Sequence, residues 1–175
     1  VRQILQRDDF QKRVDDPENP LSAIEMTYPV LQGYDSVIVK ADLEIGGADQ
    51  KLNLLMGRRM QRRFGQSEQD ILTVPLIEGF DGARKMSKSF GNAISLTAAS
   101  EEMYGQVMSV PDALIIRYLT LLTGVTSDEI ARIEQDLKKG MNPRDAKARL
   151  AREIVTQYQS ADAAARAEEQ FAAVF

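Results

Sequence analysis

The sequence predicts an α/β fold, with a parallel α/β part in the first half of the chain and an all-helical part after it. Strand-like and helix-like segments alternate in the first half, a pattern typical of parallel sheets with crossover helices. The second half shows helical periodicity only. Apolar residues make up 43% of the 175 residues, enough for a sizeable core. We place the boundary between residues 108 and 109.

The first half is expected to contain three helices and two strands. The prolines of DDPENP end the first helix, and the capping box SAIE starts the second at Ser22. Pro29 should kink that second helix. β-Branched and apolar runs indicate the strands, and the second of them leads into a glycine-punctuated loop. In order, we expect a helix at 1–16, a helix from Ser22, a strand at 36–47, a helix at 48–64, a strand at 71–77 and the loop at 79–92.

The second half is expected to be helical at 112–123, 128–139, 143–158 and 161–174. Gly124, Gly140 and Pro143 separate these helices. Two groups of residues are interpreted as packing rather than as a site. They are Met103, Tyr104 and Met108, and the helical stripe Leu150, Ile154 and Tyr158.

Composition excludes several kinds of chemistry within this chain. The absence of Cys rules out disulfides and thiolate sites and fits a reducing, cytoplasmic location. The absence of His rules out His-based triads and most zinc sites. We expect no metal site, and we also expect no tightly bound cofactor. With 22 cations against 26 anions, any contact with nucleic acid must be local. No apolar run approaches the roughly 20 residues of a membrane span, so no membrane association is expected.

The stretch TYPVLQGYD places three polar side chains on one helix face. Tyr28, Gln32 and Asp35 stand at positions i, i+4 and i+7. A phenol, an amide and a carboxylate together can hold an ammonium group and a hydroxyl. The same spacing also fits a solvated polar face, and spacing alone does not separate the two interpretations.

The stretch IGGADQ joins an expected strand to an expected helix. Ligands of parallel sheets bind at this end of a strand, where helix N-termini present backbone N–H groups. Gly46 and Gly47 would allow a ligand close to the backbone, and Asp49 could accept hydrogen bonds from ribose hydroxyls. A plain turn, with Asp49 as the acidic residue of the helix N-terminus, is the alternative.

The stretch GARKMSKSFGN carries the strongest signal. Lys85 and Lys88 lie three residues apart in a loop that directly follows a buried type of strand. Two ammonium groups there could neutralise a triphosphate and a leaving pyrophosphate. The alternative is a solvated basic loop.

These motifs together resemble one enzyme family. KMSKS at 85–89 resembles the signature lysine loop of class I aminoacyl-tRNA synthetases. TYPVLQGYD and IGGADQ are similar to the amino-acid pocket helix and the ribose-contacting turn of the bacterial tyrosyl branch, in the same order. MSVPDALIIRYLTLLTG and NPRDAKARLAREIV resemble its helical domain. Residues 1–108 would then be the C-terminal part of a Rossmann-like catalytic domain, and residues 109–175 the helical domain on the anticodon-arm side.

The resemblance implies a role for each matching residue. Tyr28 and Gln32 would hold the ammonium group of tyrosine, and Asp35 its phenol hydroxyl. Gln50 would lie beside the carboxylate. The ATP contacts would be Gly47 and Asp49 at the ribose, Leu76 and Ile77 at the adenine, and Lys85, Ser87 and Lys88 in the mobile loop, where the two lysines stabilise the transition state.

The implied reaction is the ATP-dependent activation of tyrosine, with Mg²⁺ accompanying ATP, followed by transfer to tRNA(Tyr). The family is homodimeric. It also carries a His-x-Gly-His-type motif, and this chain has no histidine. We therefore expect an internal or C-terminal fragment that is inactive by itself. The alternatives are a fragment of a tryptophanyl enzyme and a non-catalytic, truncated RNA-binding relative.

Arginines concentrate on the segment GRRMQRRFG at 57–65. They could contact phosphates of the tRNA acceptor end. The interpretation that we favour is that these arginines lie on the solvent-exposed face of a helix, with Met60 and Phe64 turned inward.

Overall fold

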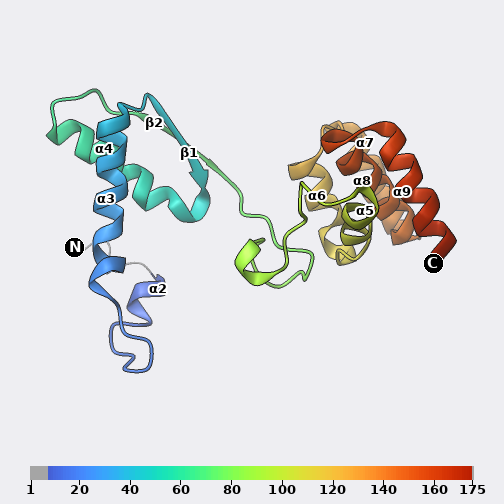
Figure 1. The fold of residues 1–175 in the computed structure, drawn as a ribbon, viewed down its shortest axis with the longest axis horizontal. Coiled ribbons are helices and arrows are strands. Elements are labelled where there is room, and N and C mark those ends of the chain that lie inside the picture. Colours follow the sequence, from blue (N-terminus) through green and yellow to red (C-terminus); the bar gives the residue numbers. More distant parts are fainter. Residues whose placement is uncertain (1–7, 175) are drawn as a thin grey trace. The chain divides into compact units, whose positions relative to one another are not determined.

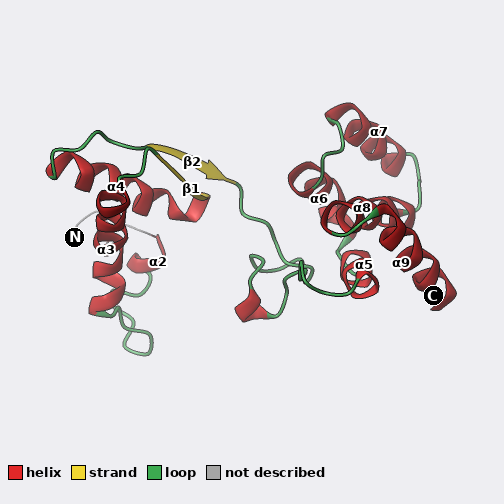
Figure 2. Ribbon diagram, turned by 45° about the horizontal axis from the view of Figure 1, so that its top comes forward, coloured by secondary structure: helices red, strands yellow, loops and turns green. Residues whose placement is uncertain are grey.

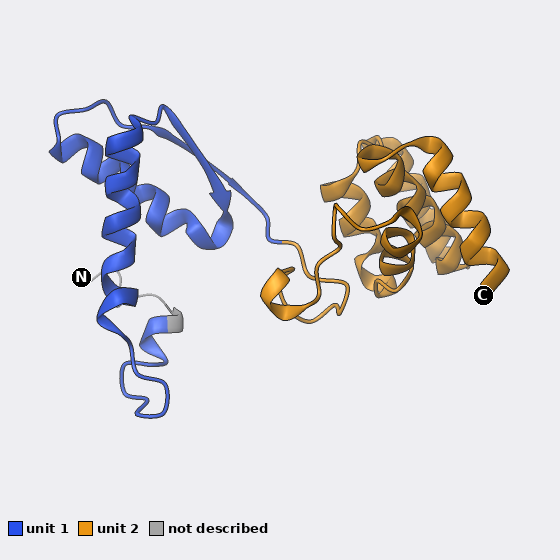
Figure 3. Ribbon diagram, viewed as in Figure 1, with its two compact units in different colours: residues 1–76 blue, residues 77–175 orange. Residues whose placement is uncertain are grey.

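The computed structural model describes residues 8–174. The chain folds into two compact units, Val1–Leu76 and Ile77–Phe175 (Figure 3). This division follows the contacts between residues. The predicted domain boundary between residues 108 and 109 stays a prediction. None of the described helices is long and apolar enough to cross a membrane.

The first unit contains a β-α-β arrangement with a second helix packed on it (Figures 1 and 2). Its two strands pair in parallel, with Leu43 opposite Asp70 and Gly47 opposite Val74. The predicted α/β class is therefore confirmed. The elements are α2 (Asp8–Gln11), α3 (Ala23–Val39), β1 (Leu43–Gly47), α4 (Lys51–Arg63) and β2 (Asp70–Val74). Of the helix expected at 1–16, residues 1–7 lie outside the described part of the chain.

Helix α3 starts where its capping box predicts. The backbone N–H of Glu25 donates to Ser22 Oγ (3.2 Å), and the N–H of Ser22 donates to Glu25 Oε2 (2.9 Å). The strand predicted at 36–47 is wrong in its first part, because α3 continues to Val39 and ends at Lys40 in a left-handed conformation (φ 55°). Helix packing, which buries Val37, overrides the β propensity of this run.

Two glycines allow α3 and α4 to approach each other closely. A Cβ on Gly33 would lie 2.9 Å from Met56 Cγ. A Cβ on Gly57 would lie 2.5 Å from Ser36 Oγ and 2.7 Å from Gln69 Nε2. The side chains and glycine buried on α4 are Asn53, Leu54, Gly57 and Gln61, so the buried face carries two amides.

The second unit is helical after a long loop. All four predicted helices are present, with the first shortened, and a helix at 100–108 was not predicted. Met103, Tyr104, Leu150 and Ile154 are buried as expected, but Tyr158 is 45% exposed and does not belong to the core. The helices are α5 (Ser100–Met108), α6 (Ile115–Leu122), α7 (Ser127–Lys138), α8 (Pro143–Tyr158) and α9 (Ala161–Val174).

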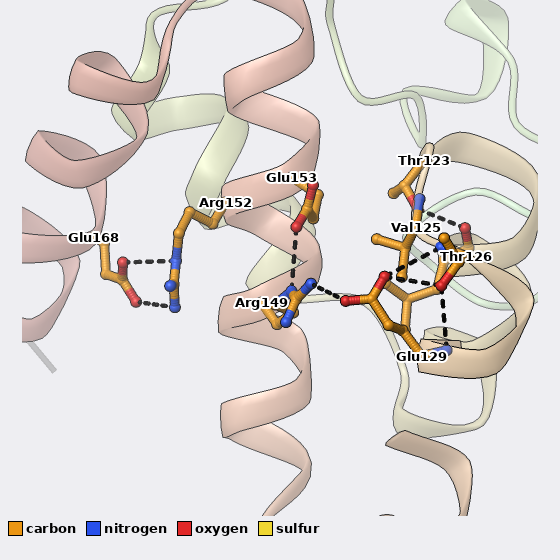
Figure 4. A network of polar contacts seen from close by, with 9 residues as sticks. Thr123, Val125, Thr126, Glu129, Arg149, Arg152, Glu153 and Glu168 are labelled. Atoms are coloured by element: carbon orange, nitrogen blue, oxygen red, sulfur yellow. Dashed lines mark hydrogen bonds and ion pairs between the residues drawn. The ribbon is translucent and has the colours of Figure 1, made fainter. Parts of the chain in front are cut away.

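Ion pairs join three of these helices along α8 (Figure 4). Arg149 contacts Glu129 of α7 (3.4 Å) and Glu153 of α8 (3.1 Å). Arg152 contacts Glu168 of α9 (3.0 Å). Because these side chains are partly exposed, each pair contributes little to stability.

Candidate active site

Tyr28 and Gln50 are brought together by a buried amide that was not singled out from the sequence. Asn53 of α4 is 1% exposed. Its Nδ2 donates to the hydroxyl of Tyr28 on α3 (3.1 Å) and to Oε1 of Gln50 (2.7 Å). Gln50 ends the 3-10 turn Ala48–Gln50 that follows β1. Two of the four residues predicted to contact tyrosine thus share one hydrogen-bond network.

Gln32 and Asp35 lie beside a carboxylate of the sheet. Glu44 of β1 accepts hydrogen bonds from Gln32 Nε2 (3.5 Å), from Ser36 Oγ (2.9 Å) and from the side-chain amide of Gln69. Gln32, Asp35 and Glu44 line the same open cavity of about 370 Å³ between α3 and β1. The polar face of α3 therefore borders a hollow.

Three residues predicted to contact ATP meet at the carboxyl end of β1. Gly47 is the last residue of the strand, and a Cβ there would lie 2.6 Å from Asp49 Oδ1 and 3.0 Å from Leu76 Cδ2. A side chain at position 47 would therefore fill the space between the other two residues. This is the end of a parallel strand at which nucleotides bind in open α/β sheets.

The lysine loop of the second unit has a defined fold of its own. The N–H of Met86 donates to the carbonyl of Ile77 (2.7 Å), and the N–H of Gly79 donates to that of Arg84 (2.8 Å), which makes a small hairpin. A 3-10 turn, Lys88–Phe90, follows. Ser87 Oγ caps this turn by accepting from the N–H of Ser89 (3.2 Å), a local ordering role. Lys85 and Lys88 are both exposed.

Asn92 holds this loop together and was not identified from the sequence. It is 2% exposed. Its Nδ2 donates to Asp81 Oδ2 (3.0 Å) and to the carbonyl of Lys85 (3.2 Å), while its Oδ1 accepts from the N–H of Ser87 (2.8 Å). A Cβ on Gly79 would lie 2.3 Å from the Asn92 amide, so glycine is required there. Gly91 and Asn92 close the stretch GARKMSKSFGN, but nothing in that local pattern marks Asn92 as buried.

Asp81 and Arg84 interact with other groups of the lysine loop. The pKa of Asp81 is lowered, chiefly by the backbone N–H of Ala83 and also by Asn92 and Arg84. Arg84 lies 3.6 Å from Asp81 and stacks 4.7 Å above the ring of Phe90. Arg84 is thus engaged inside the loop, and its interactions hold the segment that presents Lys85.

The predicted site residues are shared between the two units. Tyr28, Gln32, Asp35, Gly47, Asp49, Gln50 and Leu76 lie in the first unit, and Ile77, Lys85, Ser87 and Lys88 lie in the second. Within residues 8–174, no group of three or more acidic side chains is arranged to hold a metal ion.

Two arginines of α4, Arg58 and Arg62, contact residues of the first unit that precede β2. Arg58 lies 3.3 Å from Glu68 and donates to the carbonyl of Gln69. Arg62 also contacts Glu68 (2.5 Å). The structure therefore supports a role for these two in fixing the segment before β2. The prediction that Phe64 turns inward is wrong, since it is 55% exposed and packs against Tyr34 (ring centroids 5.4 Å apart).

The sequence matches a family of enzymes over its whole length. The family model described as "tRNA synthetases class I (W and Y)" matches residues 1–175. The chain therefore belongs to this family of class I tRNA synthetases.

Curated relatives narrow the similarity to one branch. The chain is 50% identical over 176 residues to "Tyrosine--tRNA ligase" of Carboxydothermus hydrogenoformans, with 100% of this chain and 43% of that protein covered. It is 51% identical over 171 residues to the protein of the same name from Coxiella burnetii, with 98% of the chain and 43% of the relative covered. The chain thus spans less than half the length of these relatives.

Solved structures of the same group share the fold. A C-terminally truncated mitochondrial tyrosyl-tRNA synthetase of Aspergillus nidulans superimposes with a TM-score of 0.68 at 24% identity, covering 99% of this chain and 51% of that one. Tyrosyl-tRNA synthetase of Archaeoglobus fulgidus, complexed with L-tyrosine, gives 0.64 at 23% identity, with coverages of 95% and 57%.

Proposed function

We propose that this chain is the part of a tyrosine–tRNA ligase that carries the amino-acid pocket helix, the ribose turn and the lysine loop. In the reaction, the carboxylate of tyrosine attacks the α-phosphate of ATP, the bond to pyrophosphate breaks, and tyrosyl-adenylate forms. The tyrosyl group then passes to the 3′ end of tRNA(Tyr). Positioning and charge stabilisation suffice for both steps, without a covalent intermediate on the protein.

The tyrosine half of the proposal depends chiefly on one observation. Tyr28 of α3 and Gln50 after β1 share the amide of Asn53, so residues 22 positions apart meet at one place. Tyr28 and Gln32 would take the ammonium group, and Gln50 the carboxylate. Asp35, at the cavity beside Glu44, would take the phenol hydroxyl.

Asp35 would also set the choice between tyrosine and phenylalanine. A site built around a substrate hydroxyl leaves its own polar group unpaired when the hydroxyl is missing. Such sites reject the hydroxyl-free analogue by about 10⁴- to 10⁵-fold. This role requires the Asp35 carboxylate, because a hydrophobic pocket discriminates only weakly between the two substrates.

The nucleotide half would use residues between Gly47 and Lys88. The backbone of Gly47, the carboxylate of Asp49 and the side chain of Leu76 lie together and would contact ribose and adenine, with Ile77 next in the chain. Lys85 and Lys88 would follow the charge that develops on pyrophosphate, with Ser87 shaping the loop. Mg²⁺ would accompany the triphosphate, because the described residues offer no acidic cluster for it.

The two alternatives are less well supported. The family description covers tryptophan and tyrosine enzymes alike, but the relatives at about 50% identity are named tyrosine ligases. A non-catalytic RNA-binding relative would not need the family's site residues that this sequence carries, among them Tyr28, Asp49 and Lys85.

We also propose the context in which the chain works. The chain covers 43% of its relatives, and the family's His-x-Gly-His-type motif is absent, so it would act as part of a longer protein and be inactive alone. That protein would be a homodimer in the cytoplasm. The lack of cysteine in this chain fits the cytoplasmic location. The intact mass of the protein in its source cell tests this directly.

The activity is tested by grafting. Residues 1–175 replace the matching segment of the Carboxydothermus hydrogenoformans enzyme, and ATP–pyrophosphate exchange is measured with tyrosine, tryptophan and phenylalanine. We expect exchange with tyrosine only. Lys85→Ala and Lys88→Ala should each slow it by about 10²- to 10³-fold, and Lys139→Ala, an exposed lysine of the helical unit, should not. A folded graft that supports no exchange, or prefers tryptophan, would contradict the proposal.

A further inference from the structure

We propose that Asn53 is a positioning residue of the amino-acid site: its buried amide turns Gln50 so that the Gln50 N–H groups face the substrate carboxylate. This inference rests on the proposed function. It concerns a residue behind the site, on α4, and not one that touches tyrosine directly. The contacts of Asn53 with Tyr28 and Gln50 define the role.

The burial of Asn53 calls for an explanation. It is 1% exposed on the face of α4 that packs into the first unit, next to Leu54, a position where an apolar side chain would be usual. Burying an amide is unfavourable unless it is hydrogen-bonded. The two hydrogens on Nδ2 are both used, one on the hydroxyl oxygen of Tyr28 and one on Oε1 of Gln50, whereas the buried Oδ1 has no hydrogen-bond partner among the described residues. Asn53 thus connects α3, the turn after β1 and α4.

The direction of these bonds decides what Gln50 can offer. A carboxamide has an acceptor end and a donor end. Because Gln50 Oε1 accepts from Asn53, its acceptor end is turned inward, and Nε2 remains as the end available to a ligand. A carboxylate accepts hydrogen bonds and does not donate them, so it requires this orientation. If Gln50 turned over, its oxygen would repel the carboxylate.

The orientation makes a prediction that separates two ligands. Tyramine is tyrosine without the carboxylate, so it does not use Gln50. In the grafted enzyme, Asn53→Ala should raise KM for tyrosine by about tenfold, the loss of roughly one well-oriented hydrogen bond. The inhibition constant of tyramine should rise by clearly less than this, because tyramine can lose only what Asn53 contributes through Tyr28. KM for ATP should change by less than about twofold.

A double substitution tests whether Asn53 acts through Gln50. In a Gln50→Ala background, Asn53→Ala should raise KM for tyrosine by much less than about tenfold, because the side chain that it orients is gone and only its contact with Tyr28 remains. The matched control is Gln66→Ala. Gln66 is a partly buried amide of the same unit, bonded to the carbonyl of Val37 (3.0 Å), and its loss should not separate tyrosine from tyramine.

Folding is checked by circular dichroism for every variant. If Asn53→Ala fails to fold, Asn53→Asp carries the same test, because aspartate has the same shape and its ionised carboxylate cannot donate to Gln50 Oε1. Equal weakening of tyrosine and tyramine, or an undiminished effect of Asn53→Ala in the Gln50→Ala background, would overturn the inference alone. A grafted parent enzyme without tyrosine-dependent exchange would instead overturn the proposed function, and the inference with it.

Discussion

Single side chains and glycines decide how closely the elements of the first unit approach. At Gly57 an added Cβ would lie 2.5 Å from Ser36 Oγ and 2.7 Å from Gln69 Nε2, and both of these neighbours donate to Glu44. The carboxylate that receives them also accepts from Gln32. The absence of a side chain at Gly57 therefore preserves the contact between α3 and α4 and the hydrogen bonds that Glu44 accepts.

Gly57→Ala should destabilise the chain by about 1–3 kcal/mol, because the added methyl group must displace two hydrogen-bonded side chains. Urea unfolding followed by far-ultraviolet circular dichroism measures this. The matched control is Gly105→Ala in α5, where an added Cβ would meet nothing within 4 Å beyond the backbone of its own helix and its chain neighbours. That change should be neutral or stabilising by up to about 1 kcal/mol. An equal effect of both substitutions would contradict the packing argument.

Glu25 should make the first unit sensitive to acid. The hydrogen bond from Arg13 (2.6 Å), together with the capping box of Ser22, lowers the pKa of Glu25 from 4.5 to about 2. A lowered pKa in the folded state stabilises the protein above the unfolded pKa of about 4.5, and this stabilisation is lost as the pH falls toward 2.

The measurement is thermal unfolding of α3 as a function of pH, with Arg13→Gln as the test variant. The variant should lose stability at neutral pH and show a weaker pH dependence between pH 4.5 and 2. Lys12→Gln, the neighbouring cation, is the control and should leave the profile unchanged. A profile of Arg13→Gln identical to that of the parent chain would argue against this ion pair.

At the scale of elements, the sequence identified structure where a local rule dominates. The capping box at Ser22 and the punctuation at Gly124, Gly140 and Pro143 located helix ends correctly, because those signals act within one turn. The β-branched run at 37–39 was misassigned, since its conformation is decided by α4, which is distant in sequence. Helix α5 was not predicted. Met103, Tyr104 and Met108 were interpreted as packing residues, but no helix was assigned to the segment that contains them.

The same reasoning applies to the site. Lys85, Asp49 and Tyr28 were identifiable because their motifs are contiguous in sequence. Asn53 and Asn92 act through contacts with residues on other elements or across a loop, and no local pattern marks a buried asparagine as a hub. Which buried amides connect the motifs follows only from tertiary packing.

Asn92→Ala should loosen the lysine loop without unfolding the helices. It removes the acceptor of the Ser87 N–H and the donor to Asp81 and Lys85, a local loss of about 1–3 kcal/mol. Amide hydrogen exchange of Ser87 should accelerate by about tenfold to hundredfold.

The control for this experiment is Asn142→Ala, which removes the N-cap of α8, where Asn142 Oδ1 accepts from the N–H of Arg144 (3.0 Å). It should accelerate exchange at the start of α8 and leave Ser87 unchanged. Unchanged exchange at Ser87 in Asn92→Ala would show that the loop does not depend on this amide.

At the scale of the whole molecule, the first unit exposes apolar side chains on its two-stranded sheet. Ile45 is 61% exposed, Leu72 51% and Val74 47%. Isolated parallel pairs are unusual, because parallel sheets are normally covered on both faces. This exposure fits the proposal that the chain belongs to a longer ligase, whose curated relatives it matches over 43% of their length.

The central claim, that this chain recognises tyrosine through the face of α3 and the turn after β1, is tested most directly by calorimetry. The chain is titrated with a non-hydrolysable tyrosyl-adenylate analogue and, as control, with the phenylalanyl analogue. We predict binding of the tyrosyl analogue, and binding of the phenylalanyl analogue that is weaker or undetectable, because Asp35 would be left unpaired. Equal affinity for both analogues, or no binding of either by a chain shown to be folded, would contradict the claim.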